Sequence, residues 1–136
     1  MPMRTTHLLD RAFLTAHLLT GNAEDAEAAI EEAIKAWDPV GEDERILMRR
    51  VIRASLRHEG GYGSYAPSGS LPLELENVLS LSIQLRRCFV LRVLEGLPRE
   101  TCGELLHLDS PQVDGNTCAA LRLLACSWAQ TPRFAA

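Results

Sequence analysis

The sequence predicts an all-α protein made of two small helical modules. Apolar residues recur at three- and four-residue spacing through most of the 136 residues, which is the period of one helix face. The breaks between these periodic stretches fall at glycine, proline and aspartate residues, which end helices and form turns. Residues 60–70 are rich in glycine and serine and cannot bury a core. We therefore expect a three-helix module at 1–59, a linker at 60–70 and a second helical module at 71–136.

Three helices are expected in the first module. Residues 5–20 place apolar side chains along one side, and Gly21 closes this helix because glycine tolerates positive φ. Asn22 begins the second helix with Asp25 three residues later, which is close to a capping box. The third helix, residues 42–58, has acidic residues in its first turn and arginines in its last turn, as the helix dipole favours.

The second module is expected to hold four helices. The first is a short helix at 71–81. Ser82 can cap the next helix and Gly96 can end it. Pro98 suits the first turn of a short third helix, and the last helix runs from about residue 111 to 128. We expect the inward-facing side chains of this module to be Leu75, Val78, Leu79, Leu85, Cys88, Phe89, Leu91, Val93, Leu94, Cys102, Leu105, Leu106, Val113, Cys118, Leu121, Leu124 and Trp128.

The last two helices match the geometry of a helix-turn-helix unit. In such a unit the final helix is offered to the major groove of DNA. One feature of the sequence disturbs this geometry, since Asp114-Gly115-Asn116 is itself a turn signal. We therefore expect the last helix to be kinked or to begin late, near Asn116.

The order of these motifs resembles a known family. The run LRVLEGL at residues 91–97, followed by a short and then a longer helix, resembles region 4 of the extracytoplasmic-function group of sigma-70 family factors. The run LLTGNAEDAEAAIEEAIKAW at residues 18–37 is similar to region 2 of the same factors. The matching positions in it are Gly21, Asp25, Ala26, Glu27, Glu32 and Trp37, with the tryptophan one place early. The resemblance covers nearly the whole chain.

The resemblance implies partners and contact residues. In that family the surface of region 2 docks on the clamp helices of the largest RNA polymerase subunit, so core RNA polymerase is the implied partner and an anti-sigma protein is a further one. The implied polymerase contacts are Asp25, Glu27, Glu31 and Glu32. The implied DNA contacts are Arg49, Arg50, Arg53, Arg57, Gln112 and Arg122. An acidic helix face that only meets solvent is the simpler interpretation of the glutamates.

Two departures from the family predict weak or lost promoter recognition. Those factors use aromatic side chains to capture unpaired bases, and residues 39–61 contain no aromatic residue. In the last helix the basic residues that the family places after Gln112 are missing, and Asp114, Gly115 and Asn116 follow instead. The net charge of -4 also gives little overall attraction to phosphates. We expect a sigma-like transcription protein that binds core RNA polymerase.

Two other functions stay open at this point. One is a protein-interaction module derived from a sigma factor, which binds polymerase, an anti-sigma partner or itself and contacts no promoter. The scarcity of basic residues in the last helix favours it. The other is a helix-turn-helix regulator of a different lineage that binds DNA as a dimer.

The cysteines are expected to be structural. Cys88, Cys102, Cys118 and Cys126 all fall on predicted apolar helix faces, where they serve as small buried hydrophobic residues in the reduced form. A zinc site made of Cys102, His107, Cys118 and Cys126 is the alternative, but its spacings lack the close cysteine pair of most such sites.

Other classes of function find no support in the sequence. There is no glycine-rich phosphate loop, no His-Glu-x-x-His and no Gly-x-Ser-x-Gly, so we expect neither an enzyme nor a cofactor. No apolar run approaches the ~20 residues that a bilayer crossing requires. We expect a cytoplasmic protein without membrane contact.

Overall fold

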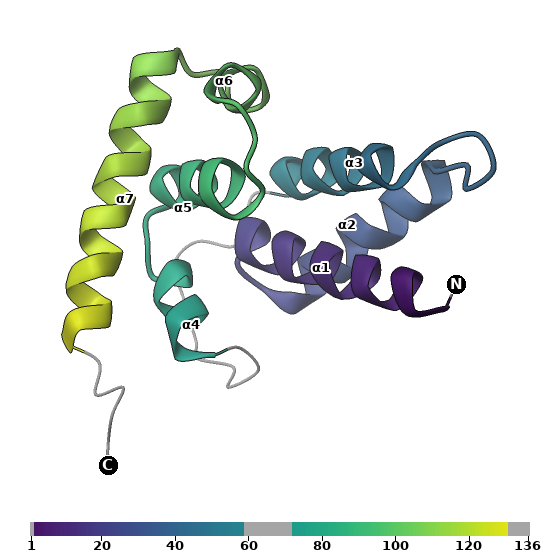
Figure 1. Ribbon diagram of the computed structural model, residues 1–136, viewed down its shortest axis with the longest axis horizontal. Coiled ribbons are helices and arrows are strands. Elements are labelled where there is room, and N and C mark those ends of the chain that lie inside the picture. The colour runs from purple at the N-terminus through teal and green to yellow at the C-terminus, as the bar shows by residue number, and fades with distance from the viewer. Residues whose placement is uncertain (1, 59–71, 131–136) are drawn as a thin grey trace. The chain divides into compact units, whose positions relative to one another are not determined.

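The computed structural model describes residues 2–58 and 72–130, which form helices and short connections with no strand among them (Figure 1). The prediction of an all-α fold is therefore confirmed. The helices group into two compact units, with α1 to α3 in one and α4 to α7 in the other. The predicted linker at 60–70 lies outside the described residues. That the two units are sigma-like modules stays a prediction.

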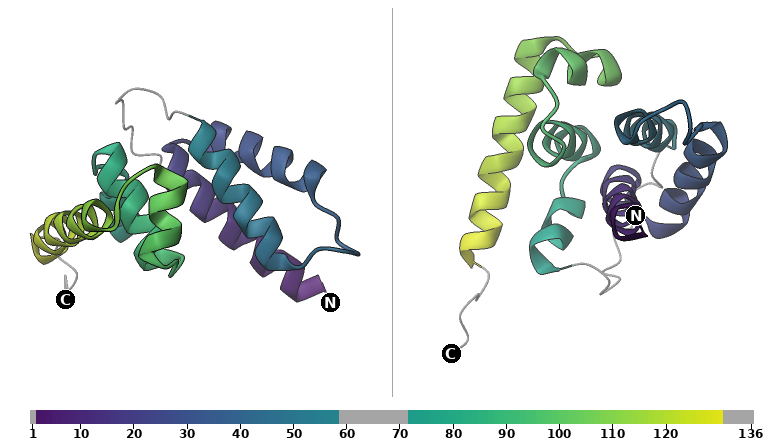
Figure 2. Two further views of the ribbon diagram at one scale, coloured as in Figure 1. Left: turned by 90° about the horizontal axis from the view of Figure 1, so that it is seen from above. Right: turned by 45° about the vertical axis from the view of Figure 1, so that its right-hand side comes forward.

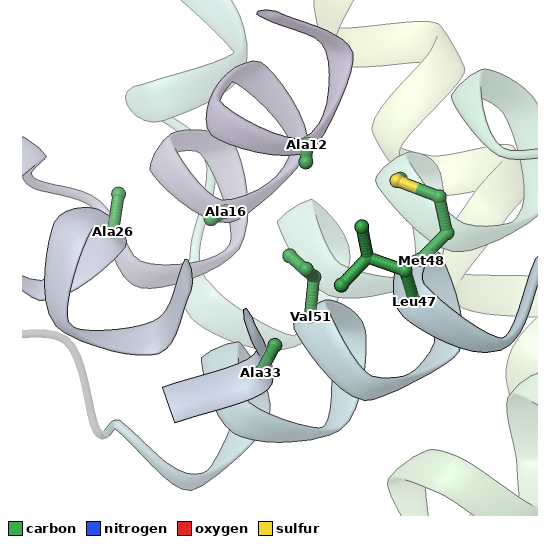
Figure 3. Close-up of a cluster of buried hydrophobic side chains, with 7 residues drawn as sticks. All are labelled: Ala12, Ala16, Ala26, Ala33, Leu47, Met48 and Val51. Carbon is green, nitrogen blue, oxygen red and sulfur yellow. The ribbon is translucent and has the colours of Figure 1, made fainter. Parts of the chain in front are cut away.

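The first unit packs three helices around a core of small side chains. These helices are α1 (Pro2–Thr20), α2 (Ala23–Ala36) and α3 (Glu44–Arg57), and each contacts the other two. The buried cluster in Figure 3 is Ala12, Ala16, Ala26, Ala33, Leu47, Met48 and Val51. Because four of these seven residues are alanines, little side-chain bulk separates the helix backbones.

Local signals set the ends of these helices as the sequence predicts. Gly21 has a φ of 89° and follows the last residue of α1. Asn22 is the N-cap of α2, where its Oδ1 accepts a hydrogen bond of 2.8 Å from the backbone N–H of Asp25. Asp43 caps α3 in the same way, with its Oδ1 3.1 Å from the backbone nitrogen of Ile46.

The second unit is built around a long terminal helix. It comprises α4 (Leu73–Leu79), α5 (Ile83–Phe89), the π-helical segment η1 (Val90–Leu94), α6 (Arg99–Leu106) and α7 (Ser110–Gln130). As Figure 1 and Figure 2 show, α7 lies alongside α5, with α6 near its start and α4 near its end. At that end the indole Nε1 of Trp128 donates a hydrogen bond of 3.2 Å to the carbonyl of Glu74.

The expected kink or late start of the last helix is wrong, because α7 runs without a break from Ser110. A reciprocal capping box precedes it. The Oδ1 of Asp109 accepts from the backbone N–H of Gln112 at 2.8 Å, and Gln112 Oε1 accepts from the backbone N–H of Asp109 at 3.0 Å. This box fixes the first helical turn ahead of Asp114 and Gly115, so the turn signal at those residues has no effect.

The expected inward positions around residue 93 are also wrong. In η1 the backbone N–H of Glu95 bonds to the carbonyl of Val90 at 2.9 Å, which widens the turn by one residue. Val93 and Leu94 are consequently 44% and 41% exposed, although the α-helical period would turn them inward. Gly96 ends the segment with a φ of 67°, as predicted. Ser82 stands at the N-cap of α5, but its side chain makes no capping hydrogen bond.

The inner face of α7 differs from the predicted one, and so does the placement of the cysteines. Val113, Ala120 and Leu124 are buried, whereas Cys118 and Leu121 are exposed. A burial stripe that passes through alanine is hard to recognise from apolar spacing alone. The expectation that all four cysteines are buried holds only for Cys88 and Cys102, since Cys118 and Cys126 are exposed.

Candidate functional site

A hollow lies between α2 and α3 in the first unit. It has a volume of about 370 Å³. We call it the arginine groove, and its lining residues are Glu32, Ala33, Ala36, Ile46, Arg49, Arg50, Arg53, Ala54 and Arg57. The buried side chains of Ala33 and Ala54 are too small to fill the space between the helices. All four arginines that the sequence predicts as DNA contacts of the first module are therefore brought together.

Two of these guanidinium groups are held by carboxylates. Arg57 forms an ion pair with Glu32, which links α3 to α2. Arg50 Nη2 lies 2.7 Å from Glu42 Oε2, just before the start of α3. The hydrogen bond from Arg50, and then that from the backbone N–H of Asp38, hold the pKa of the Glu42 carboxyl below its usual value. Glu42 therefore stays ionised and keeps Arg50 in place.

The other two arginines of the groove have no carboxylate partner in the part of the chain that the structure describes. Arg49 and Arg53 are exposed, and no ion pair to either is found among the described residues. They stand four residues apart on α3, so their side chains emerge on the same face, one turn after the other. Arg45 is exposed one turn earlier but does not line the groove. The groove thus presents free cationic groups to solvent.

The four predicted polymerase contacts are not equivalent in the structure. Glu27 and Glu31 are exposed at i and i+4 on α2, so they share one face. Asp25 is half-buried, and its Oδ2 accepts a hydrogen bond of 2.8 Å from the side chain of Asn22. Glu32 is engaged with Arg57 in the groove. Only Glu27 and Glu31 remain as acids presented outward from this predicted set.

The turn between α6 and α7 is tight. His107 takes the left-handed conformation with a φ of 59°, and the backbone N–H of Leu108 bonds to the carbonyl of Gly103 at 2.9 Å. A Cβ atom on Gly103 would lie 2.5 Å from the carbonyl oxygen of Leu108. The turn can approach α6 this closely only because residue 103 has no side chain. The turn therefore joins α6 to α7 over only a few residues.

The start of α7 carries little free positive charge. Arg99 Nη1 lies 2.9 Å from Asp114 Oδ2, so the positive charge of Arg99 at the start of α7 is offset by an acid. Gln112 is exposed, but its side chain is used in the capping box with Asp109. Arg122 is exposed further along α7. The two predicted DNA contacts of this unit, Gln112 and Arg122, thus lie apart on α7, and Gln112 serves to cap the helix.

Comparisons with protein-family models, with curated proteins and with solved structures find no match.

Two further observations concern metals and membranes. Among the described residues, no three or more His, Cys, Asp or Glu side chains gather closely enough to hold a metal ion. The four residues of the alternative zinc site are not brought together, since Cys102 is buried and Cys118 is exposed. In the same part of the chain, no helix combines the length and the apolar character that crossing a bilayer requires.

The sequence analysis named the arginines of the groove but not the residues of α2 that line its other side. The family resemblance named these arginines, which fall on one predicted helix, as DNA contacts. The participation of Ala33 and Ala36 follows from the packing of α2 on α3, for which the local sequence has no signal. The role of Glu42, which lies outside the helix that carries Arg50, was missed for the same reason.

Proposed function

We propose that this chain is a sigma-like regulatory protein that binds core RNA polymerase through α2 and reads promoter DNA weakly or not at all. The observation that carries the polymerase contact is the exposed pair Glu27 and Glu31, on the helix whose sequence is similar to region 2 of the sigma factors. Two like charges one turn apart on an exposed face attract a basic surface, and they affect the association rate in particular.

The second half of the proposal concerns DNA. A helix that reads DNA needs cations for the phosphates and long polar side chains for the base edges. At the start of α7 the positive charge of Arg99 is offset by Asp114, and Gln112 is occupied by capping. The tight turn after α6 supports a helix-turn-helix origin, while these charges support a loss of reading function.

The polymerase contact is tested by a pull-down with purified core RNA polymerase. We expect the folded chain to be retained, and the single variants Glu27→Arg and Glu31→Arg to bind several-fold more weakly. Glu74→Arg is the matched control, because it makes the same charge change at an exposed position of the other unit. Absence of any retention by the folded wild-type chain would refute the proposal.

The DNA half is tested by fluorescence anisotropy with a random duplex. We expect the wild-type Kd to lie in the range of non-specific binders, on the order of 10⁻⁴–10⁻⁶ M. Asp114→Lys frees Arg99 and adds a cation, so affinity should rise and should fall more steeply with salt, by about two more phosphate contacts. Asp10→Lys makes the same charge change on α1 and should have little effect. Tight wild-type binding, or an equal gain in both variants, contradicts the interpretation of α7.

One observation favours the alternative of a protein-interaction module. The outward face of α7 carries Cys118, Leu121 and Ala125, which are all exposed and uncharged. A protein partner would cover such a face more favourably than a phosphate backbone would. In this case Leu121→Glu abolishes partner capture by the folded protein while the pull-down with core polymerase stays unchanged.

A further inference from the structure

We propose that the arginine groove between α2 and α3 binds a small polyanion that carries at least two phosphate groups, such as inorganic pyrophosphate or a nucleoside polyphosphate. This proposal is independent of polymerase binding, because the exposed acids Glu27 and Glu31 do not line the groove. Three features of the groove favour such a ligand, namely the size of the hollow, the charge of its lining and the placement of Arg49 and Arg53.

The groove has the size and lining of a small-molecule site. Its volume of about 370 Å³ lies near the lower end of the ~300–1,000 Å³ that small-ligand pockets occupy. Its lining includes the buried side chains of Ala33 and Ala54 and the exposed side chains of Ala36 and Ile46. The hollow therefore combines apolar surface with charged groups, which is the usual composition of a site for an organic anion.

The charge of the lining calls for more than one anionic group. The lining residues include four arginines and one glutamate, and that glutamate already pairs with Arg57. Glu42 pairs with Arg50 in addition, so the charges of Arg49 and Arg53 remain, and a single monoanion would offset only one of the two. Arginine presents its donors as a planar fork that binds phosphate oxygens in pairs, so each free guanidinium suits one phosphate group.

The free arginines are spaced for neighbouring phosphates. Arg49 and Arg53 follow each other at i and i+4, where Cβ atoms on a helix lie ~5–6 Å apart. Long, unpaired side chains at this separation can reach adjacent phosphates of one ligand. Arg50 and Arg57 are held by Glu42 and Glu32, so their guanidinium groups have fixed positions in the lining of the groove.

The same features disfavour a nucleic-acid strand as the occupant. Proteins that hold single strands stack bases on aromatic side chains, and α3 carries none. The groove also gathers four arginines around one hollow, whereas Arg45, which would extend a track along α3, lies outside it. A compact ligand uses this arrangement better than an extended backbone does.

The test is isothermal titration calorimetry of the full chain, without polymerase, against sodium pyrophosphate, tripolyphosphate, a nucleoside triphosphate and a single-stranded oligonucleotide. We expect saturable one-site binding of pyrophosphate or tripolyphosphate. Arg49→Gln and Arg53→Gln should each weaken it about tenfold, since each removes a charge-assisted contact. Tighter binding of the nucleoside triphosphate than of tripolyphosphate would place its base on the apolar surface of the lining, and equal binding would mean that the phosphates alone are recognised.

Two further variants distinguish binding inside the groove from general attraction between an anion and the positive charge of α3. Arg45→Gln removes a cation from the same exposed side of α3 without touching the groove, so binding should change less than twofold. Ala36→Leu keeps every charge but fills part of the hollow, and should weaken binding by about the same factor as Arg49→Gln. Circular dichroism establishes that each variant is folded, which is expected for changes at exposed positions.

Three results would overturn the proposal. They are the absence of binding by any phosphate compound, an equal loss in Arg45→Gln and Arg49→Gln, and binding of the oligonucleotide alone with Ala36→Leu unaffected. The last result would assign the arginines to a nucleic-acid surface. Since polymerase is absent, none of these results bears on the polymerase contact, and Glu27→Arg should bind phosphate compounds as the wild type does.

Discussion

Replacing Gly103 by alanine should destabilise the second unit by about 2 kcal/mol. The added Cβ would lie 2.5 Å from the carbonyl oxygen of Leu108, about 1 Å inside a favourable non-bonded separation. The neighbour is backbone, so the turn itself must move, at a cost of ~1–3 kcal/mol for overpacking. That movement also weakens the hydrogen bond from the Leu108 N–H to the Gly103 carbonyl, which costs ~1 kcal/mol of stability. The higher helix propensity of alanine stabilises the helix by about the same amount, so these two contributions cancel.

Gly115→Ala is the matched control within the same unit. No atom outside its own stretch of helix lies within 4 Å of the position of its Cβ, and Gly115 is exposed in α7. The same substitution should therefore stabilise the protein by ~0.5–1 kcal/mol. The change in unfolding free energy on replacing glycine by alanine should therefore have opposite signs at Gly103 and Gly115.

The measurement is urea denaturation followed by the fluorescence of Trp128. A Trp37→Phe background removes the signal of the first unit, so the transition reports the second unit alone. The midpoint for Gly103→Ala should fall, with a melting temperature lower by about 10 °C in a parallel thermal scan. If Gly103→Ala proves as stable as the wild type while Gly115→Ala behaves as expected, the close approach of the turn to α6 is wrong.

Two other predictions concern ionisable groups. Iodoacetamide near pH 8 should label Cys118 and Cys126 in the native protein and spare Cys102, because burial raises the pKa of the Cys102 thiol to about 11; labelling of all three at one rate, seen by peptide mass spectrometry, would contradict this. The lowered pKa of Glu42 means that its bond with Arg50 stabilises the fold above the ordinary carboxyl pKa, and that this contribution is lost as pH falls through the lowered value. Arg50→Gln should raise the Glu42 pKa in an NMR titration, and an unchanged pKa would show that the pair does not form in solution.

The helices and many of their ends were predictable because capping is local. Gly21, Asn22 and Gly96 each act through the conformation or hydrogen bonds of their own few residues, which the sequence shows directly. The start of α7 was a harder case, since two local signals conflict. The capping box of Asp109 and Gln112 outweighs the turn signal that follows it, and the burial of residues later in α7 adds to its advantage.

The faces of the helices were less predictable, because register depends on packing. The inner face of α7 passes through Ala120, a residue whose hydrophobicity gives little contrast with its neighbours, so Cys118 and Leu121 were assigned inward instead. In the candidate site, the arginines of α3 were named through the family resemblance and fall on one predicted helix. The opposing residues on α2 could not be predicted, because the contact between two helices has no signature in the local sequence.

The π-helical segment η1 contains one residue more than an α-helical turn would. An α-helix of the same rise would need fewer residues, so the segment has absorbed what amounts to a single-residue insertion. Deleting one residue between Val90 and Leu94 should therefore restore regular α-helical hydrogen bonds in this turn, while the residues that follow keep their phase. A chain one residue shorter at this point should present the outer faces of α6 and α7 as this chain does, because the wider turn has already accommodated the extra residue.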